Sequence, residues 1–173
     1  MPEKSKLDTI ANIAIILVCI IAAVILIRNN FFPGSAGRPA GAPPEAKKGE
    51  TYAELRQAVP AGTDRALVLA LSPTCHFCND SMPFYKQLLD QRNQKGSAVK
   101  VIAAVPGDDV KSDEEKNFTS HGIQPDSIIA VDFKKIKVPG TPTVLLVDNQ
   151  GKILDVWVGK LDGSREREVL ARL

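Results

Sequence analysis

The sequence is poor in features that mark several classes of protein. Its 173 residues include only three cysteines, which are too few for a scaffold held by disulfides or for a zinc site with four thiolates. Its 22 basic and 20 acidic residues leave a net charge of +2, so it lacks the basic field that attracts nucleic acid. We therefore expect neither a disulfide-stapled module nor a nucleic-acid partner.

One long apolar run is present near the N-terminus. Residues 10–27 have Asn12 as their only strongly polar member, and as a helix they would be about 27 Å long, at the low end of what crosses a bilayer core. A cleaved signal peptide has a shorter apolar core followed soon by small residues. Here Arg28 follows a longer core, so we predict an uncleaved transmembrane anchor, with Cys19 as a small apolar residue inside it.

The composition changes on both sides of this run. Residues 1–9 are a short polar N-terminus, and residues 28–50 hold four prolines and four glycines, a composition typical of a linker. Basic residues lie both before and after the run, so the positive-inside rule does not decide its orientation. Residues 51–173 are long enough for one globular core.

The globular part alternates between helical and strand patterns. The turn residues and apolar periodicity predict a central mixed sheet with helices on both faces and a hairpin near the end. Capping boxes at Thr51–Glu54 and Ser112–Glu115 mark two helix starts. We expect helices over 51–59, 79–93 with a kink at Pro83, 112–122 and 164–173, and strands over 66–71, 99–105, 127–131, 144–148 and 152–158.

The most informative motif is Cys75-His76-Phe77-Cys78, placed between the apolar strand 66–71 and the following helix. The N–H groups and the positive dipole end of a helix stabilise negative charge at such a point. A thiol placed there can have its pKa lowered from about 8.5 into a range of roughly 3.5 to 7.5. The second cysteine lies about one turn away and can close a disulfide with the first, which favours exchange of electrons with other thiols.

Two other interpretations of the motif remain. The pair could be a structural disulfide, or Cys75, Cys78 and His76 could bind copper in a metal-transfer protein. His121 is the only other histidine, and the following Gly122 favours a helix end there. We expect a redox pair that requires no metal and no cofactor.

Four features together resemble the thioredoxin fold. These are the strand followed by the CxxC motif and a helix, Pro83 eight residues after Cys75, the segment Gly140-Thr141-Pro142-Thr143 before a hairpin, and the terminal helix. The resemblance covers residues 51–173. With the anchor, the linker and the run that continues to Asp148, the chain is similar to membrane-anchored thiol-disulfide oxidoreductases of the TlpA/ResA type, and Ser72-Pro73-Thr74-Cys75 is also similar to MauD.

This resemblance implies a mechanism. Cys75 would attack a substrate disulfide, Cys78 would resolve the mixed disulfide, and Thr141–Pro142 would be a cis peptide bond beside the pair. The backbone before Pro142 would pair with an extended substrate peptide. The expected function is reduction of protein disulfides. The alternatives are a disulfide donor of the same fold, or a copper-binding or assembly module without redox turnover.

The resemblance also implies a place in the cell. Proteins of this type are extracytoplasmic, so the N-terminus would be cytoplasmic and the domain would face the periplasm from the inner membrane. A membrane electron donor would then recycle the dithiol. Cytochrome c maturation is the process that the family suggests, with apocytochrome c as a family-level substrate.

The sequence departs from these relatives near the motif. His76 and Phe77 replace the usual Pro- or Gly-containing pair; His76 could stabilise the thiolate or point to solvent, and Phe77 could contact partners or pack under the loop. Thioredoxin has a buried aspartate six residues before its first cysteine, where this chain has Leu69. The usual proton acceptor for the resolving thiol is therefore absent. Thr74 stands where thioredoxin has a tryptophan, and we expect Trp157 in the core.

One acidic stretch lies outside the motif. Asp108 and Asp109 are followed by Asp113-Glu114-Glu115 at a predicted helix start. We expect these side chains to be solvated, with a docking surface as the alternative.

Overall fold

The computed structural model describes residues 13, 15–20 and 45–173 of the chain. Contacts divide the chain into two units, 1–42 and 43–173. In the first unit, residue 13 and residues 15–20 are helical and exposed. No helix within the described residues has the length and apolar character needed to cross a membrane. Most of the predicted anchor over 10–27, the N-terminus over 1–9 and residues 28–44 of the linker lie outside the described residues.

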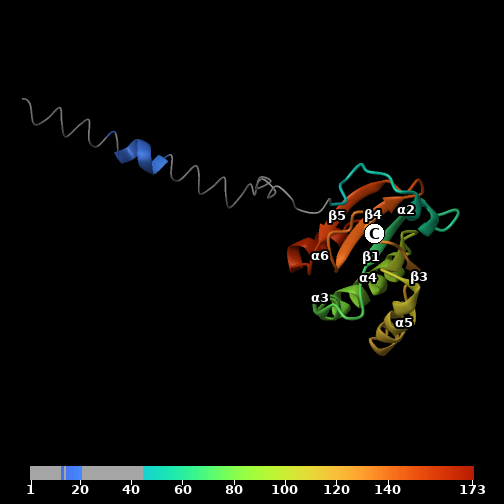
Figure 1. The fold of residues 1–173 in the computed structure, drawn as a ribbon. Helices are drawn as coiled ribbons and strands as arrows, with labels where there is room; N and C mark the ends of the chain where they lie inside the picture. The colour runs from blue at the N-terminus through green and yellow to red at the C-terminus, as the bar shows by residue number, and fades with distance from the viewer. Residues whose placement is uncertain (1–12, 14, 21–44) are drawn as a thin grey trace, which may run out of the picture. The chain divides into compact units, whose positions relative to one another are not determined.

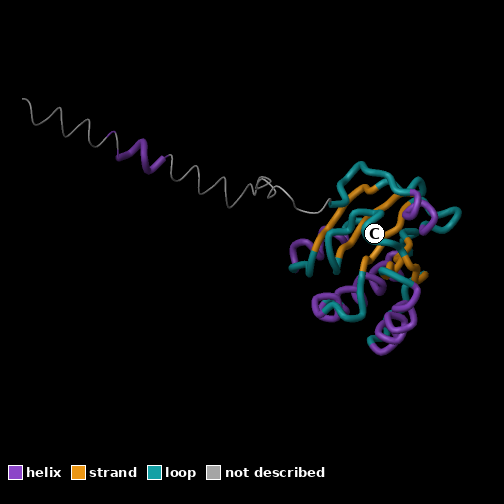
Figure 2. Tube along the Cα trace, viewed as in Figure 1, coloured by secondary structure: helices purple, strands orange, loops and turns teal. Residues whose placement is uncertain are grey.

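The second unit is built around one five-stranded sheet (Figures 1 and 2). The spatial order of the strands is β3-β2-β1-β4-β5. Strands β1, β2 and β3 are parallel, whereas β4 runs antiparallel to β1 and β5 antiparallel to β4. The expected mixed sheet with a final hairpin is confirmed. Its strands are β1 (Arg65–Ala70), β2 (Lys100–Val105), β3 (Ser127–Ala130), β4 (Thr143–Asp148) and β5 (Ile153–Val158).

The central strands are buried on both faces because each face has its own cover. On one face, Leu67 and Leu69 of β1 pack with α3, α4, α5 and α6. On the other face, Ala66 and Val68 pack with α2 and with residues 131–138. A strand buried in this way reads as a continuous apolar run rather than an alternation. The helices are α2 (Ala53–Ala58), α3 (His76–Asp80), α4 (Met82–Lys95), α5 (Lys111–Ser120) and α6 (Gly163–Leu170), with a 3-10 turn η1 (Asp108–Val110) before α5.

The region after the cysteine motif differs from the expected single kinked helix. Helix α3 begins at His76, three residues earlier than predicted, and the chain leaves the helix at Ser81 before α4 starts. Pro83 therefore lies in the first turn of a new helix and not in the interior of a long one. Proline is tolerated in a first turn because an N–H there has no partner within the helix.

Neither predicted capping box forms. Helix α2 starts after Tyr52 and α5 starts after Val110, and in both cases no side chain caps the first turn. Thr51 instead makes an isolated β-bridge with Lys152. The helices form in these places because Leu55 and Phe118 are buried against the sheet, so tertiary packing replaces the local signal.

Residues 45–50, which we expected in the linker, lie along the folded domain. The Ala46 N–H donates to the carbonyl of Lys137 at 2.7 Å, and Gly49 and Glu50 exchange hydrogen bonds with Ile153 at 2.8 Å. Ala46 is buried, with 3% of its surface exposed. The packed part of the chain therefore begins before residue 51.

Candidate active site

Cys75 lies where β1 ends and α3 begins. It is the N-cap of α3, and its Sγ accepts a hydrogen bond from the N–H of Cys78 at 3.2 Å. The thiol also donates to the carbonyl oxygen of Thr141 at 3.3 Å, across 66 positions of sequence. Cys75 is half-buried and is a free thiol. The Cys75 sulfur thus has a backbone N–H and a backbone carbonyl as its hydrogen-bond partners.

Cys78 is more deeply buried than Cys75. Its side chain is fully buried, and it is also a free thiol. Burial, together with the neighbouring Cys75, raises the pKa of Cys78 to about 12. At neutral pH Cys78 is therefore a thiol that must lose a proton before it can act as a nucleophile.

The segment that faces Cys75 comes from the loop before β4. The peptide bond between Thr141 and Pro142 is cis, the geometry that the resemblance implies. The carbonyl of Pro142 accepts from the Gly159 N–H at 2.8 Å, and the Thr143 hydroxyl donates to the Gly140 carbonyl at 2.7 Å. These bonds fix the loop, so the structure brings Cys75, Cys78, Thr141 and Pro142 together.

His76 points away from the thiols and toward Asp80 on the next turn of α3. Its Nε2 lies 3.5 Å from Asp80 Oδ2, and its side chain is 82% exposed. Lys160 donates to the same carboxylate at 2.9 Å, and this bond, together with the nearby His76, lowers the pKa of Asp80. Of the two readings of His76, the structure favours the one in which it faces solvent.

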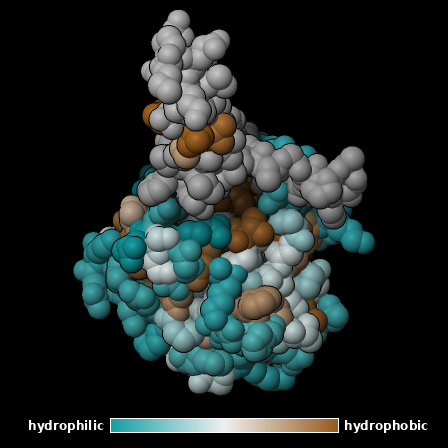
Figure 3. Space-filling model, turned by 90° about the vertical axis from the view of Figure 1, so that its left-hand side faces the viewer, coloured by the Kyte–Doolittle hydropathy of each residue, from teal (hydrophilic) through white to brown (hydrophobic). Residues whose placement is uncertain are grey.

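Phe77 is the large apolar side chain that the fold leaves uncovered. In residues 45–173 it alone among large hydrophobic residues is exposed, with 57% of its surface accessible. The part of the domain visible in Figure 3 is mostly hydrophilic with small apolar patches, so such exposure stands out. Phe77 does not pack under the loop and is free to contact a partner.

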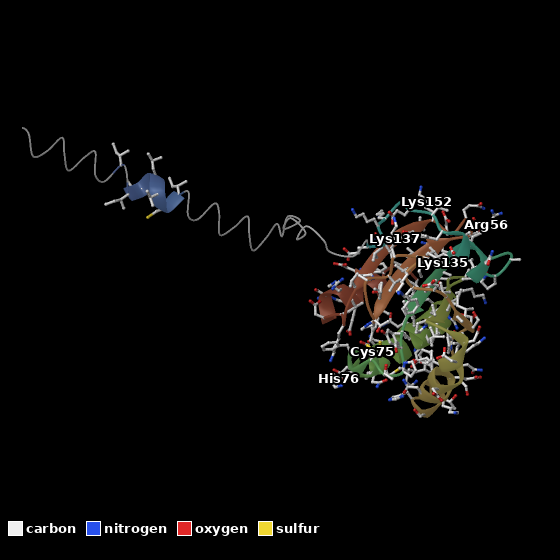
Figure 4. The ribbon with its side chains drawn as sticks, in the orientation of Figure 1. Arg56, Cys75, His76, Lys135, Lys137 and Lys152 are labelled. Atoms are coloured by element: carbon white, nitrogen blue, oxygen red, sulfur yellow. The ribbon has the colours of Figure 1, made fainter. Side chains whose placement is uncertain are left out.

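Four basic side chains lie far from the cysteine motif. Arg56, Lys135, Lys137 and Lys152 are at the end of the domain opposite to Cys75 and His76 (Figure 4). Lys137 is paired there with Glu50 at 3.0 Å. The hydrogen bond that the Tyr52 hydroxyl donates to Glu50, and after it the bond from Lys137, lowers the pKa of Glu50 to about 2. By contrast, the ion pair between Lys160 and Asp80 is formed at α3 itself.

The prediction that the acidic stretch is solvated is wrong for one residue. Asp108, Asp109, Asp113 and Glu115 are exposed, but Glu114 is fully buried. Its place on α5, three and four residues before Asn117 and Phe118, turns it toward the core. The spacing of Glu114 and Phe118, four residues apart on one face of a helix, could have predicted that Glu114 is buried. The capping-box pattern instead indicated an exposed helix start.

Trp157 lies in the core as expected. Only 4% of its surface is exposed, and its indole N–H donates to Glu168 of α6 at 3.2 Å. Leu69, at the position of the aspartate in thioredoxin, is fully buried in an apolar layer. No group of three or more histidine, cysteine or acidic side chains in the described part of the chain is arranged to hold a metal ion.

Comparison with known proteins gives a family and a set of similar folds. Residues 52–173 match the model of a thioredoxin-like domain. Three solved structures are similar over most of their length, and all three are under 25% identical to this chain, so they inform on the fold alone. No curated protein matches the sequence.

The first of these structures is StoA from Bacillus subtilis, with 15% identity, a TM-score of 0.51 and coverage of 64% of this chain and 84% of that one. A protein from Chlorobium tepidum, provisionally assigned as thiol:disulfide interchange protein DsbE, has 22% identity, a TM-score of 0.52 and coverage of 75% and 93%. A secreted disulfide oxidoreductase from Mycobacterium tuberculosis, described as homologous to DsbE of E. coli, has 17% identity, a TM-score of 0.51 and coverage of 64% and 83%.

Proposed function

Because the chain belongs to the thioredoxin-like domain family, we propose that it is a thiol-disulfide oxidoreductase that reduces disulfides of extracytoplasmic proteins through Cys75 and Cys78. The observation that carries this proposal is the half-buried Cys75 thiol at the start of α3, in contact with the Thr141 carbonyl beside the cis proline. A structural disulfide would not need one sulfur open to a partner. The proteins of similar fold include one described as a disulfide oxidoreductase and one assigned as a thiol:disulfide interchange protein, which belong to the class of activity proposed here.

In the proposed reaction the Cys75 thiolate attacks a substrate disulfide. A new bond forms between Cys75 and one substrate sulfur, and the other substrate sulfur leaves as a thiolate that takes a proton from solvent. Cys78 then loses its proton and attacks Cys75, which closes the protein disulfide and releases the second substrate thiolate. Two electrons pass from the protein dithiol to the substrate disulfide.

The surface around Cys75 suits a protein substrate. The exposed ring of Phe77 offers an apolar contact next to the reactive sulfur. The loop at Thr141 offers backbone groups to an extended peptide, the mode of recognition known as strand addition. A folded domain held by a tether would then reach disulfides in chains that have not yet folded.

The finer assignment is a protein of the TlpA/ResA type, anchored by residues 10–27 in the inner membrane with its domain in the periplasm. The sequence supports it through the apolar run and the Pro- and Gly-rich segment after it. Recycling of the disulfide then requires a membrane electron donor. Fractionation of cells that express the full chain, followed by protease treatment of intact spheroplasts, tests this topology: a soluble or protected domain contradicts it.

The experiment that tests the activity is a redox titration of the full-length protein carrying Cys19→Ala, so that only Cys75 and Cys78 remain. We expect one reversible two-electron couple in glutathione and dithiothreitol buffers, with a midpoint near or below about −270 mV. A midpoint near about −120 mV would show a disulfide donor instead. A protein with no reversible couple is not an oxidoreductase.

A further inference from the structure

Lys137 has an unusual backbone conformation. Its φ is 53°, and it is the one residue other than glycine with a positive φ in the described part of the chain. This region favours glycine, because a side chain there crowds the neighbouring backbone. Residues with side chains keep such a conformation where the surrounding contacts determine it, and these outliers cluster at functional sites. A lysine at this position therefore implies that its contacts offset the cost.

The contacts of Lys137 are made with residues 45–52, the segment through which the chain enters the domain (the entry segment). Lys137 Nζ donates to Glu50 Oε1 at 3.0 Å and lies 5.9 Å from the centre of the Tyr52 ring. Glu50 in turn accepts a hydrogen bond from the Tyr52 hydroxyl. The carbonyl of Lys137 accepts from the Ala46 N–H at 2.7 Å. Both the side chain and the backbone of Lys137 are thus held by the entry segment.

The entry segment provides a firm support for this pair. The Gly49 N–H donates to the Ile153 carbonyl, and the Ile153 N–H donates to the Glu50 carbonyl, both at 2.8 Å. The side chains of Lys137 and Glu50 are 38% and 32% exposed, so the ion pair is partly shielded from water. The hydrogen bonds from Tyr52 and Lys137 lower the pKa of Glu50 to about 2. The pair therefore stays charged at neutral and mildly acidic pH.

Lys137 also lies at the start of the loop that faces Cys75. Residues 138–142 connect it to β4, and the carbonyl of Thr141 in this loop accepts from the Cys75 thiol at 3.3 Å. The Lys137 side chain lies toward the opposite end of the domain (Figure 4). Thr141 is only four residues further along the chain, however, and four residues span at most about 14 Å. A short piece of backbone therefore joins the entry segment to the active site.

The two ends of this loop are held by different contacts. At the end next to β4, the Gly159 N–H donates to the Pro142 carbonyl at 2.8 Å. Pro139 and Gly140, between this point and Lys137, are exposed, so packing against the core does not fix them. The contacts of Lys137 with the entry segment therefore provide the fixed point at the other end.

We propose that Lys137 is a positioning residue, whose contacts with the entry segment hold the Thr141 carbonyl in place opposite Cys75. This inference rests on the proposed function, in which Thr141 meets both the thiol and the substrate peptide. The carbonyl binds Cys75 only in the reduced protein, since a disulfide sulfur has no proton to donate. The contacts of Lys137 therefore favour the dithiol and hold the backbone ready for strand addition. The segment that leads to the predicted anchor thereby acts on the reactive site.

The test compares full-length variants that all carry Cys19→Ala. Lys137→Ala removes the side-chain contacts, and we expect the equilibrium with glutathione to shift about fivefold toward the protein disulfide, the equivalent of one hydrogen bond. This shift lowers the midpoint by about 20 mV. The KM for an unfolded protein disulfide should rise about fivefold, while kcat changes by less than about twofold. An unaltered midpoint and KM would overturn the proposal.

Two other substitutions at the same position separate the side chain from the backbone. Lys137→Arg keeps the charge that reaches Glu50, and it should restore the parent midpoint and KM. Lys137→Gly removes the side chain but adopts a positive φ without strain. It should be more stable to denaturant than Lys137→Ala and yet show the same changes in midpoint and KM. Parent values in Lys137→Gly would mean that the side chain positions nothing.

The partner of the ion pair gives an independent check. Glu50→Gln keeps the size of the side chain but removes its charge, and it should shift the midpoint and KM in the same direction as Lys137→Ala. Because the two residues act through one contact, the double variant should be little worse than either single variant. Additive shifts would show that the residues act separately, which contradicts a joint role.

Lys48→Ala is the matched control. Lys48 donates to Asp155 at 3.1 Å and so holds the same entry segment, but to β5 and not to the loop before β4. It should leave the midpoint and KM unchanged, and effects equal to those of Lys137→Ala would indicate a general loosening and overturn the proposal. A parent protein without a reversible couple contradicts the proposed function itself, whereas a normal parent with unchanged Lys137 variants contradicts only this inference.

Discussion

Cys75 and Cys78 are three residues apart and lie in opposite surroundings. Cys75 is half-buried at the helix start, next to the Thr141 carbonyl and the exposed ring of Phe77. Cys78 is fully buried, and its pKa is raised to about 12. Under the proposed function, this difference predicts that Cys75 meets the substrate and that Cys78 must lose its proton before it reacts.

The largest expected effect comes from exchanging each sulfur for oxygen. Cys75→Ser should lose all disulfide reduction, because a serine hydroxyl at neutral pH is not ionised and cannot replace a thiolate. Cys78→Ser should keep the first attack and accumulate a mixed disulfide with the substrate. Gel electrophoresis without reductant detects this adduct. If Cys75→Ser forms the adduct and Cys78→Ser does not, the roles are reversed.

The contact between the site and its substrate can be tested through Phe77. Phe77→Ser removes an exposed apolar contact, and we expect the apparent affinity for an unfolded protein substrate to fall by about tenfold, the equivalent of burying part of one aromatic side chain. The rate with a small aromatic disulfide should not change, since that reagent does not extend over the ring. Equal losses with both substrates would show that Phe77 supports the site itself rather than partner binding.

The cost of burying the Glu114 carboxyl can be tested by measuring the stability of a variant. Glu114→Leu replaces an unpartnered buried carboxyl with an apolar group of similar size, so we expect the free energy of unfolding at neutral pH to rise by about 1–3 kcal/mol. Denaturant unfolding measures the change. A loss of stability would mean that the carboxyl makes a stabilising contact.

The Glu114 carboxyl should also make the stability of the protein depend on pH. The pKa of Glu114 is raised in the folded state, so the folded protein binds this proton more tightly than the unfolded chain does. Its contribution to stability is present below the ordinary glutamate pKa and is lost as the pH rises toward the folded value. Relative to Glu114→Gln, the parent protein should therefore become less stable across that window. A constant difference between the two would contradict the shift.

The smallest effect is expected at His76. Its side chain is 82% exposed and its carboxylate partner Asp80 already binds Lys160. Exposed pairs of this kind contribute well under about 1 kcal/mol. His76→Ala should therefore move the midpoint of the redox couple by less than about 20 mV. A much larger shift would show that the imidazolium does stabilise the Cys75 thiolate.

The positions of Cys75 and of the loop that faces it could be predicted from the sequence. The order of strand, Cys75-x-x-Cys78 and helix located the N-cap sulfur, and the segment around Thr141 and Pro142 located the facing loop. Both depend on local chain geometry and on a recognisable motif, and the strands β1, β2 and β4 depend on continuous apolar runs. Patterns that depend on neighbouring residues are therefore the ones that the structure reproduces.

The burial of Glu114 could not be predicted from the sequence, because it depends on packing between distant segments. Glu114 occurs in a capping-box pattern that a solvated helix start would also show, and only the seating of Phe118 against the core turns it inward. Tyr85 follows Pro83 in a stretch that was expected to kink, whereas the chain breaks at Ser81 and begins α4 anew. The burial of Glu114 and the start of α4 at Met82 therefore depend on tertiary packing that the sequence pattern does not show.

The division between an attacking outer thiol and a protected inner thiol is tested most directly by alkylation of the reduced native protein. Iodoacetamide is added to the full-length chain with Cys19→Ala, and mass spectrometry of its peptides reports the modified residue. We expect modification of Cys75 alone at neutral pH, with Cys78 modified only after unfolding or at strongly alkaline pH. Equal modification of both cysteines in the native protein, or faster modification of Cys78, would contradict this division.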